Sequence, residues 1–509
     1  MEFHQDSLAI CAPRFVLDTV AEQLADVDLT LPDYCPNIEK ILKCSLIPKI
    51  QSKTLSGGQL QVDGVCVVNV LYVESEKKTI RCCEHTVSFS QSFSVRDAGE
   101  GNLILTKTKP EYINCRALSP RRLVIHGAFS LYAKVITPQR TELFVPERED
   151  LEVLRQKTAV CDLRSNCQEQ FTVSDEISVA DKPAIESILY SAVSAGVTDA
   201  KAVTGKLMLN GELNLRLFYL TDVETGQTAK LEYILPFNQI IDCEGVEEQT
   251  RNLLGCEVMS YDVRLKNDIM SDKPAIALDV KLCLTEEGYS LNEEEIVTDA
   301  YSVSVASAPD FENLRLTAEA TPVSDSFMEK LSVKVDSGKI SKILDIYADA
   351  VSIETAAEEN ALKAKGKINL CMVALDENGT PMFVERSFDY AHALPSAEGC
   401  DQLRFGKARA AGMSFRLADD STAEIRMELK ITGGATKTEQ VKAVRSVELF
   451  EDRPIVADDC ALTLYFAKRD ENLWNIAKAH NTRLNMLLSE NALETLALDG
   501  PRMLLIPKL

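Results

Sequence analysis

Long apolar runs are absent from this sequence of 509 residues. The longest runs, such as residues 65–72, fall far short of the ~20 apolar residues that cross a bilayer, so we expect no membrane insertion. The first residues, MEFHQDSLAICAPRF, lack a basic segment followed by an apolar one. We therefore expect no secretory signal and a cytoplasmic location.

Positive charge is scarce. The chain has 55 Lys and Arg against 78 Asp and Glu, which gives a net charge of −23. Phosphate backbones and anionic lipid surfaces repel such a chain, so we expect no nucleic-acid partner. The 45% apolar and 26% charged residues are typical of a folded globular protein, and this length predicts roughly three to five domains.

Signatures of catalysis are also missing. The sequence has no GxxxxGK[ST], no GxSxG, no HExxH and no CxxC, and it has only five histidines. The run Cys82–His85 has no second ligand pair at zinc-site spacing. We predict no catalytic residues, no metal site and no cofactor, and hence not an enzyme. The 15 cysteines are expected to be reduced and mostly buried.

One pattern occurs three times. The spacing I-x-x-I-L occurs at Ile38, Ile185 and Ile340, and a glycine follows 26 residues later each time, at Gly64, Gly211 and Gly366. Alternating apolar residues surround each glycine, which predicts half-buried β-strands. Copies 147 and 155 residues apart are too long for a solenoid, so we predict three homologous, sandwich-like β domains.

Two details of the repeat have competing interpretations. The I-x-x-I-L spacing fits one or two helical turns, but it also fits a bulged strand. A strand glycine marks a bulge or a close backbone approach, so we interpret Gly64, Gly211 and Gly366 as fold residues. Asn378-Gly379 predicts a hairpin turn in the third copy, and Thr225-Gly226 gives a weaker signal in the second.

The last 50 residues form a different unit. The acidic segment Glu451–Cys460 predicts a linker. After it we expect a strand, a helix capped by Asn472 with Leu473, Ile476 and Ala477 on its apolar face, a second helix ending near Asn491, and a closing strand. The predicted order is βααβ.

This unit resembles a LysM module. The matching residues are Leu473-Trp474-x-Ile476-Ala477, Asn481-Thr482, Leu487-Leu488, Asn491 and Leu504-Leu505-Ile506-Pro507. The resemblance implies a groove that binds N-acetylglucosamine-containing glycans, formed here by Asp470, Glu471, Asn472, Leu473, Trp474, Asn491 and Leu493.

The loop before the first helix departs from the family pattern. The family usually has Gly-Asp-Thr where this chain has Asp470-Glu471-Asn472. Two carboxylates make that loop acceptor-only, which favours a protein ligand over a sugar. Trp474 is interpreted either as a partner contact or as packing within the module.

The three β copies resemble the SPOCS domain of spore-forming Firmicutes. We predict SPOCS-like domains over residues 1–165, 166–320 and 321–455 and a LysM domain over residues 456–509. This combination resembles the SipL-like family of clostridial spore morphogenetic proteins. The resemblance implies a mother-cell scaffold at the forespore and spore coat surface. Its LysM module would dock on the SpoIVA-like coat morphogenetic ATPase, with other coat proteins as further partners. The alternative is a protein that binds peptidoglycan of the cell wall or spore cortex.

Overall fold

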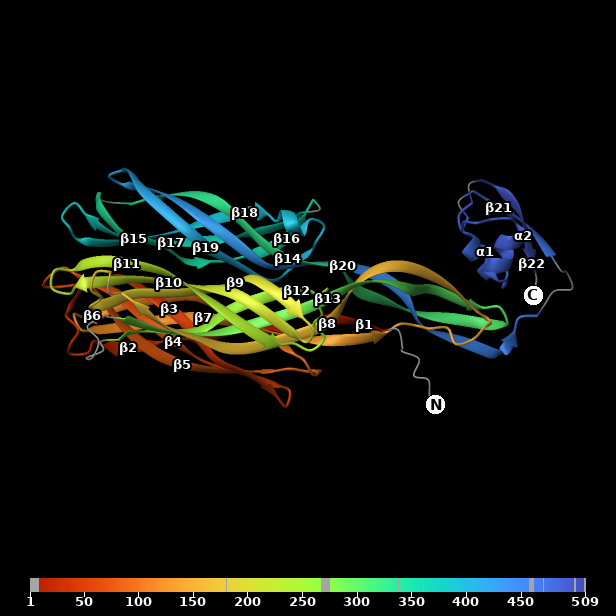
Figure 1. Ribbon diagram of the computed structural model, residues 1–509, viewed down its shortest axis with the longest axis horizontal. Helices are drawn as coiled ribbons and strands as arrows, with labels where there is room; N and C mark the ends of the chain where they lie inside the picture. The colour runs from red at the N-terminus through yellow and green to blue at the C-terminus, as the bar shows by residue number, and fades with distance from the viewer. Residues whose placement is uncertain are drawn as a thin grey trace.

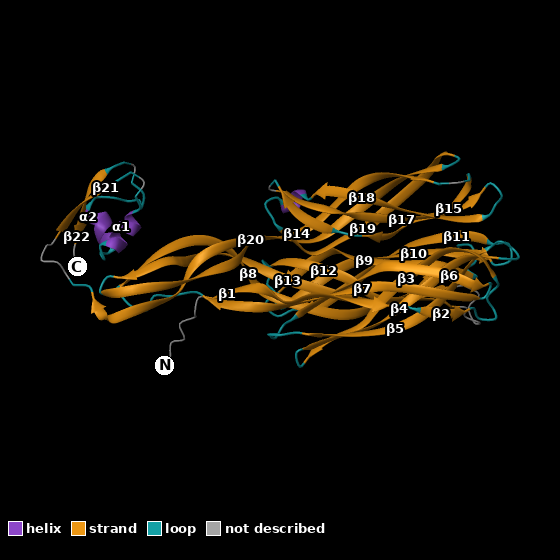
Figure 2. Ribbon diagram, turned by 180° about the vertical axis from the view of Figure 1, so that it is seen from behind, coloured by secondary structure: helices purple, strands orange, loops and turns teal. Residues whose placement is uncertain are grey.

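The computed structural model describes residues 9–179, 181–266, 275–336, 338–359, 361–456, 462–469, 471–498 and 500–507. The molecule is elongated (Figure 1). Stacked β-sheets fill one end, a narrower arm of strands extends from them, and a small unit with two helices lies at the far end. Almost all of the regular structure is strand (Figure 2), which confirms the predicted mainly β class.

The first domain is a sandwich of two antiparallel sheets. One sheet is a three-stranded meander in the order β3-β4-β5. In the other, β7 is central, with β1 and β2 along one edge and β6 along the other. The bounds are β1 (Ala9–Leu24), β2 (Val27–Thr30), β3 (Ile38–Ser56), β4 (Gln59–Glu74), β5 (Ile80–Ser94), β6 (Leu103–Ser119) and β7 (Arg122–Glu142).

The second and third domains repeat this arrangement. Their meanders are β9-β10-β11 and β15/β16-β17-β18, and their other sheets are β8-β13-β12 and β14-β20-β19. The second domain contains β8 (Leu151–Ser178), β9 (Ser187–Val203), β10 (Lys206–Asp222), β11 (Gln227–Asp242), β12 (Arg251–Lys266) and β13 (Ala275–Ser302). The third contains β14 (Val305–Lys334), β15 (Ile340–Val351), β16 (Glu354–Glu358), β17 (Ala361–Asp376), β18 (Pro381–Ala393), the 3-10 turn Pro395–Ala397, β19 (Gln402–Asp419) and β20 (Thr422–Pro454).

In each domain the first strand pairs with the last. Strand β8 pairs with β13 along its whole length, and β14 pairs in the same way with β20. The expected boundaries at 165/166 and 320/321 therefore fall inside the continuous strands β8 and β14. The expected linker Glu451–Cys460 overlaps β20, which continues to Pro454, and residues 457–460 lie outside the described residues.

The I-x-x-I-L segments are bulged strands, so the helical alternative is wrong. In all three copies the pairing register shifts at the leucine, which is the extra residue of a bulge: Leu42, Leu189 and Leu344. In the first and third copies a further register shift lies between the two isoleucines, at Glu39 and at Ser341, and a bulge there lets residues spaced by three point to the same side of the strand. In the second copy Ile185 precedes β9. In each copy the isoleucines face the core of their own domain. The three leucines meet in a single apolar cluster between the domains.

The three glycines lie on the central strand of each meander, where the neighbouring edge strand comes very close. A Cβ on Gly64 would lie 2.4 Å from the carbonyl oxygen of Lys49, and one on Gly366 would lie 2.0 Å from that of Ser352. On the other side, an aromatic ring covers each glycine: Phe89, Phe237 and Tyr390, the residues paired with them in register. These contacts confirm the close backbone approach.

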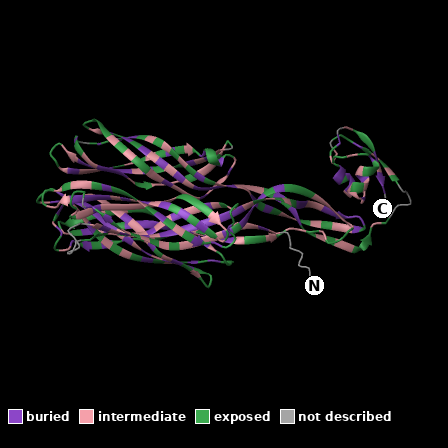
Figure 3. Cartoon of the chain, viewed as in Figure 1, coloured by how far each residue is buried: buried purple, intermediate pink, exposed green. Residues whose placement is uncertain are grey.

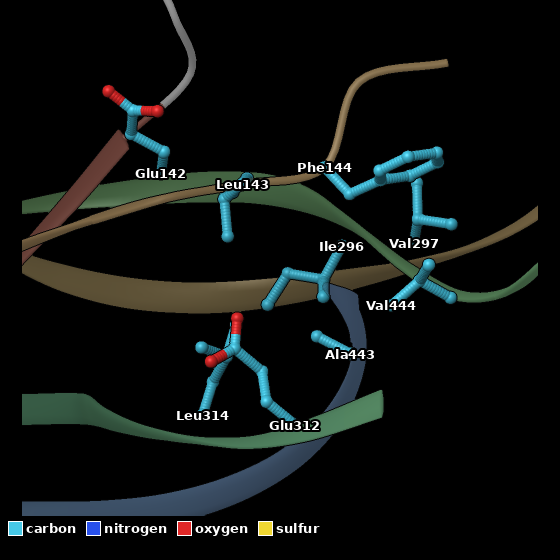
Figure 4. A pocket seen from close by; sticks show the side chains of 9 residues that line it. All are labelled: Glu142, Leu143, Phe144, Ile296, Val297, Glu312, Leu314, Ala443 and Val444. Atoms are coloured by element: carbon cyan, nitrogen blue, oxygen red, sulfur yellow. The ribbon is translucent and has the colours of Figure 1, made fainter. Parts of the chain in front are cut away.

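The arm is built from the extended ends of four strands. Residues 151–163 of β8 pair with 289–302 of β13, and residues 305–317 of β14 pair with 438–454 of β20. Buried residues run along the arm (Figure 3), and Val160, Ile296, Leu314 and Val441 form part of its core. Leu143 and Phe144 lie against the arm (Figure 4), and the gap that they border is too small for a water molecule.

The described cysteines agree with the expectation that they are unpaired and mostly buried. None of the 14 described cysteines forms a disulfide, and none is exposed. Burial raises the pKa of Cys66 and Cys256 to about 11, so both thiols are neutral at physiological pH. Cys460 lies outside the described residues.

Candidate functional site

The C-terminal module has the predicted βααβ order. It consists of β21 (Leu462–Ala467), α1 (Leu473–Ala479), α2 (Leu484–Glu490) and β22 (Arg502–Pro507), with β21 and β22 antiparallel. Its core contains Leu473, Ala477, Leu487, Leu504 and Ile506, all without exposed surface. The apolar face predicted for the first helix is therefore confirmed.

The loop before α1 holds several predicted groove residues. The Asn472 Oδ1 accepts a hydrogen bond of 2.8 Å from the backbone N of Trp474, which confirms the helix cap. The Glu471 carboxylate accepts from the backbone N of Lys468 at 3.0 Å and from the Tyr465 hydroxyl at 3.4 Å. These hydrogen bonds close the turn and hold the Glu471 carboxylate against its own loop. Asp470 lies outside the described residues.

The loop after α2 lies beside the start of α1, as a groove requires. Asn472 forms an antiparallel bridge with Ala497, and the N of Leu473 donates to the Leu496 carbonyl. Asn491 is buried between α2 and β22. Its amide donates to the carbonyls of Leu487 and Leu505 at 2.8 and 2.7 Å, and its Oδ1 accepts from the N of Leu505. Asn491 thus holds the module together, and the half-buried Leu493 packs on the same core.

Trp474 is only 2% exposed, because the tip of the arm covers it. Its indole N–H donates to Asp299 of β13 at 2.8 Å, and the Lys478 ammonium contacts the same carboxylate at 2.7 Å. The Tyr301 ring meets the indole edge-on, with 5.0 Å between ring centroids. Trp474 therefore anchors the module to the arm within the same chain.

Two further contacts fix this docking. The Tyr301 hydroxyl donates to the Thr482 carbonyl at 2.6 Å, and the backbone N of Leu484 donates to Glu152 at 3.3 Å. Burial, with Glu152 and Asp299 nearby, raises the pKa of Tyr301 well above its usual range, so its hydroxyl stays a donor. The pairing of Trp474 with a residue 175 positions away left no signal in the sequence.

The opposite side of the module exposes an apolar strip that the sequence reading missed. Along β21, Leu462, Leu464 and Phe466 are 49%, 66% and 63% exposed, and Met503 of β22, the residue paired with Phe466, is 58% exposed. Alternate residues of a strand share a face, so these side chains form one surface, here called the β21–β22 strip. Clustered exposed apolar side chains are typical of protein interaction sites.

A family model described as "SipL, SPOCS domain" matches residues 37–118 and 184–266. These ranges cover β3–β6 and β9–β12, the meander and following strand of the first two domains. No curated protein and no solved structure matches the chain. In the part of the chain that the structure describes, no helix has the length and apolarity to cross a membrane.

The two matches place SPOCS domains in the first two sandwiches, and the third sandwich repeats their strand order. The two matches support a SipL-like, sporulation-related protein.

Proposed function

We propose that the protein is a non-enzymatic scaffold of spore envelope assembly, whose C-terminal module docks on a SpoIVA-type coat protein layer at the forespore surface. The observation that carries this proposal is the β21–β22 strip on a module held at the end of a long arm. The arm separates the strip from the three sandwiches. The loops and edge strands of the sandwiches therefore remain accessible for binding other coat proteins.

The strip favours a protein over a glycan as the ligand. Glycan binding depends on hydrogen-bond donors and acceptors, whereas Leu464 and Phe466 offer only apolar surface. Of the groove residues, Trp474 and Asn491 are buried and Glu471 is engaged within its own loop. The matched SPOCS domains support the sporulation setting, and the mother-cell cytosol is the proposed compartment.

The test is recovery of partners by the tagged full chain from sporulating cells, and co-sedimentation with the polymerised SpoIVA-type protein. Phe466→Glu places a charge in the strip, and we expect a loss of binding of tenfold or more, as for a central interface aromatic. Ile234→Glu on β11 is the matched control, because Ile234 is 60% exposed and β11 belongs to the stacked sheets at the other end of the molecule (Figure 1). Unchanged recovery after removal of residues 461–509 would show that the docking proposal is wrong.

The alternative, peptidoglycan binding, is tested with the same proteins. If the full chain sediments with purified cortex peptidoglycan and Phe466→Glu does not change this, the module binds glycan. We expect no sedimentation at micromolar concentration.

A further inference from the structure

A carboxylate with no exposed surface lies at one end of the second sandwich. It belongs to Glu286 of β13, whose partner in register on β8 is Cys167. The Ser165 hydroxyl donates to Glu286 Oε1 at 2.8 Å, which leaves Oε2 facing Cys243. A Cβ on Gly288 would lie 2.1 Å from Ser165 Oγ and 2.5 Å from Oε1, so glycine at this position lets the serine hold the carboxylate in place.

Cys243 comes from the other sheet of the same sandwich. It follows directly after β11, and its Sγ lies 3.2 Å from Glu286 Oε2. Its backbone N donates to the Gly205 carbonyl at 2.9 Å, which fixes the turn. The two sulfur atoms and a carboxylate oxygen all lie within 4.8 Å of one another. Three residues from three separate elements thus converge on one point.

The groups that most affect the Glu286 carboxyl carry no positive charge. The groups that act most on the Glu286 carboxylate are Ser165, Cys243, Glu287 and Cys167, and none is a cation. A second cluster, with one cysteine and two carboxylates (Asp349, Cys371 and Glu385), differs on this point. There the Lys43 ammonium lies 2.7 Å from Asp349 and 3.0 Å from the Cys371 sulfur. A charged carboxylate buried without a cation is costly. Lys43 provides a cation in the second cluster, and no lysine or arginine is among the groups named beside Glu286.

We propose that Cys167, Cys243 and Glu286 bind a Zn²⁺ ion that joins the two sheets of the second domain. Two thiolates and a carboxylate are a ligand set that zinc accepts, with a water molecule as the fourth ligand. Zn–S and Zn–O bonds of about 2.3 and 2.1 Å place tetrahedral ligand atoms about 3.5–3.8 Å apart, which small side-chain shifts reach from the present positions. Both thiols lose their protons on binding, and the ion becomes part of the folding free energy.

The test begins with the metal content of the full-length protein, purified with reductant and without chelator or metal-affinity tag. We expect about one zinc per chain by mass spectrometry of the elements. Replacement by Co²⁺ should give the absorption of a thiolate-bound cobalt ion. Removal of the metal with a strong chelator should lower the thermal unfolding midpoint, and added Zn²⁺ should restore it.

Variants assign the ligands. Cys243→Ala and Glu286→Gln should lose the zinc, whereas Cys371→Ala, in the cluster that Lys43 already neutralises, should keep it. Cys167→Ser covers the case in which a buried substitution prevents folding, because Cys167 is only half-buried. A wild-type protein without zinc, zinc retained in the folded variants, or a Cys167–Cys243 disulfide under reducing purification would each overturn the proposal.

Discussion

The first two domains and the third share a strand order but secure it with different side chains. In the first two, a tyrosine eight residues after the central glycine bonds a proline carbonyl: Tyr72 to Pro36 at 3.3 Å, and Tyr219 to Pro183 at 3.5 Å. In the third domain the tyrosine position is Ala374 and the proline position is Gly338.

The third domain replaces the missing tyrosine–proline hydrogen bond with another one, formed by the ring that covers Gly366. Its covering ring is Tyr390 instead of phenylalanine, and the hydroxyl donates to the Ser352 carbonyl at 2.7 Å. Ser352 lies between β15 and β16, the two pieces into which this edge strand is divided. The family match, residues 37–118 and 184–266, includes the tyrosines of the first two copies and begins one residue after each proline. The sandwich therefore depends on apolar alternation and on the glycine, while the bonds that hold the edge strand vary.

The third domain also differs in how it joins its neighbour. Arg404 forms a two-bonded ion pair with Glu287 of the second domain, with exposed side-chain fractions of 8% and 0%. The buried Asp345 pairs with Arg216 of the second domain. The first and second domains are linked by the far more exposed pair Lys77–Glu224.

The largest expected effect comes from breaking this buried junction. Arg404→Met leaves the Glu287 carboxylate buried without a cation, and we expect a loss of about 3–5 kcal/mol in the free energy of unfolding, measured with urea. Adding Glu287→Leu should recover most of it, because an apolar pair needs no charge balance. The control Arg416→Met removes an exposed pair with Glu424 and should cost under about 1 kcal/mol. Equal losses in the two single variants would contradict the role of burial.

Alanine at the repeat glycines should have the next largest effect. Gly366→Ala and Gly64→Ala force a Cβ against backbone carbonyls at 2.0 and 2.4 Å, and overpacking of this kind costs about 1–3 kcal/mol. Gly211→Ala should cost less, because its nearest backbone atom is 2.9 Å away and the closer contacts are with the end of the Phe237 side chain. The same urea unfolding series should give this order.

Gly412→Ala is the control for this series, because a Cβ there meets its nearest atom at an ordinary 3.7 Å. A cost at Gly412 equal to that at Gly366 would show that the close approach is not what requires glycine.

The sequence predicted the repeated sandwich because alternation and the glycine spacing are local patterns. It could not place β8 and β14 correctly, since their partners lie up to about 150 residues further along the chain. The sequence also could not decide between a helical turn and a bulged strand for the I-x-x-I-L segments. An extra residue in a strand produces the same apolar spacing as a helix, and the bulges at Leu42, Leu189 and Leu344 appear only in the strand pairing.

For the candidate site, the sequence predicted what short-range bonds determine. The Asn472 cap and the end of α2 near Asn491 follow from neighbouring residues. The burial of Trp474 depends on Asp299 and Tyr301 of the arm, which no local pattern connects to it. The β21–β22 strip was also missed, because composition does not show which face of an apolar strand is left uncovered.

The smallest expected effects come from the tyrosine hydroxyls that distinguish the copies. Tyr390→Phe gives the third domain a phenylalanine ring as in the first two and removes a 2.7 Å bond to the junction between β15 and β16, so we expect a loss of about 1 kcal/mol. Tyr72→Phe and Tyr219→Phe remove bonds of 3.3 and 3.5 Å, and each should cost about 0.5 kcal/mol or less because long bonds are weak. Urea unfolding of the three variants side by side gives the order. A larger loss for Tyr219→Phe than for Tyr390→Phe would mean that the proline contact, and not the glycine-covering ring, holds the edge strand.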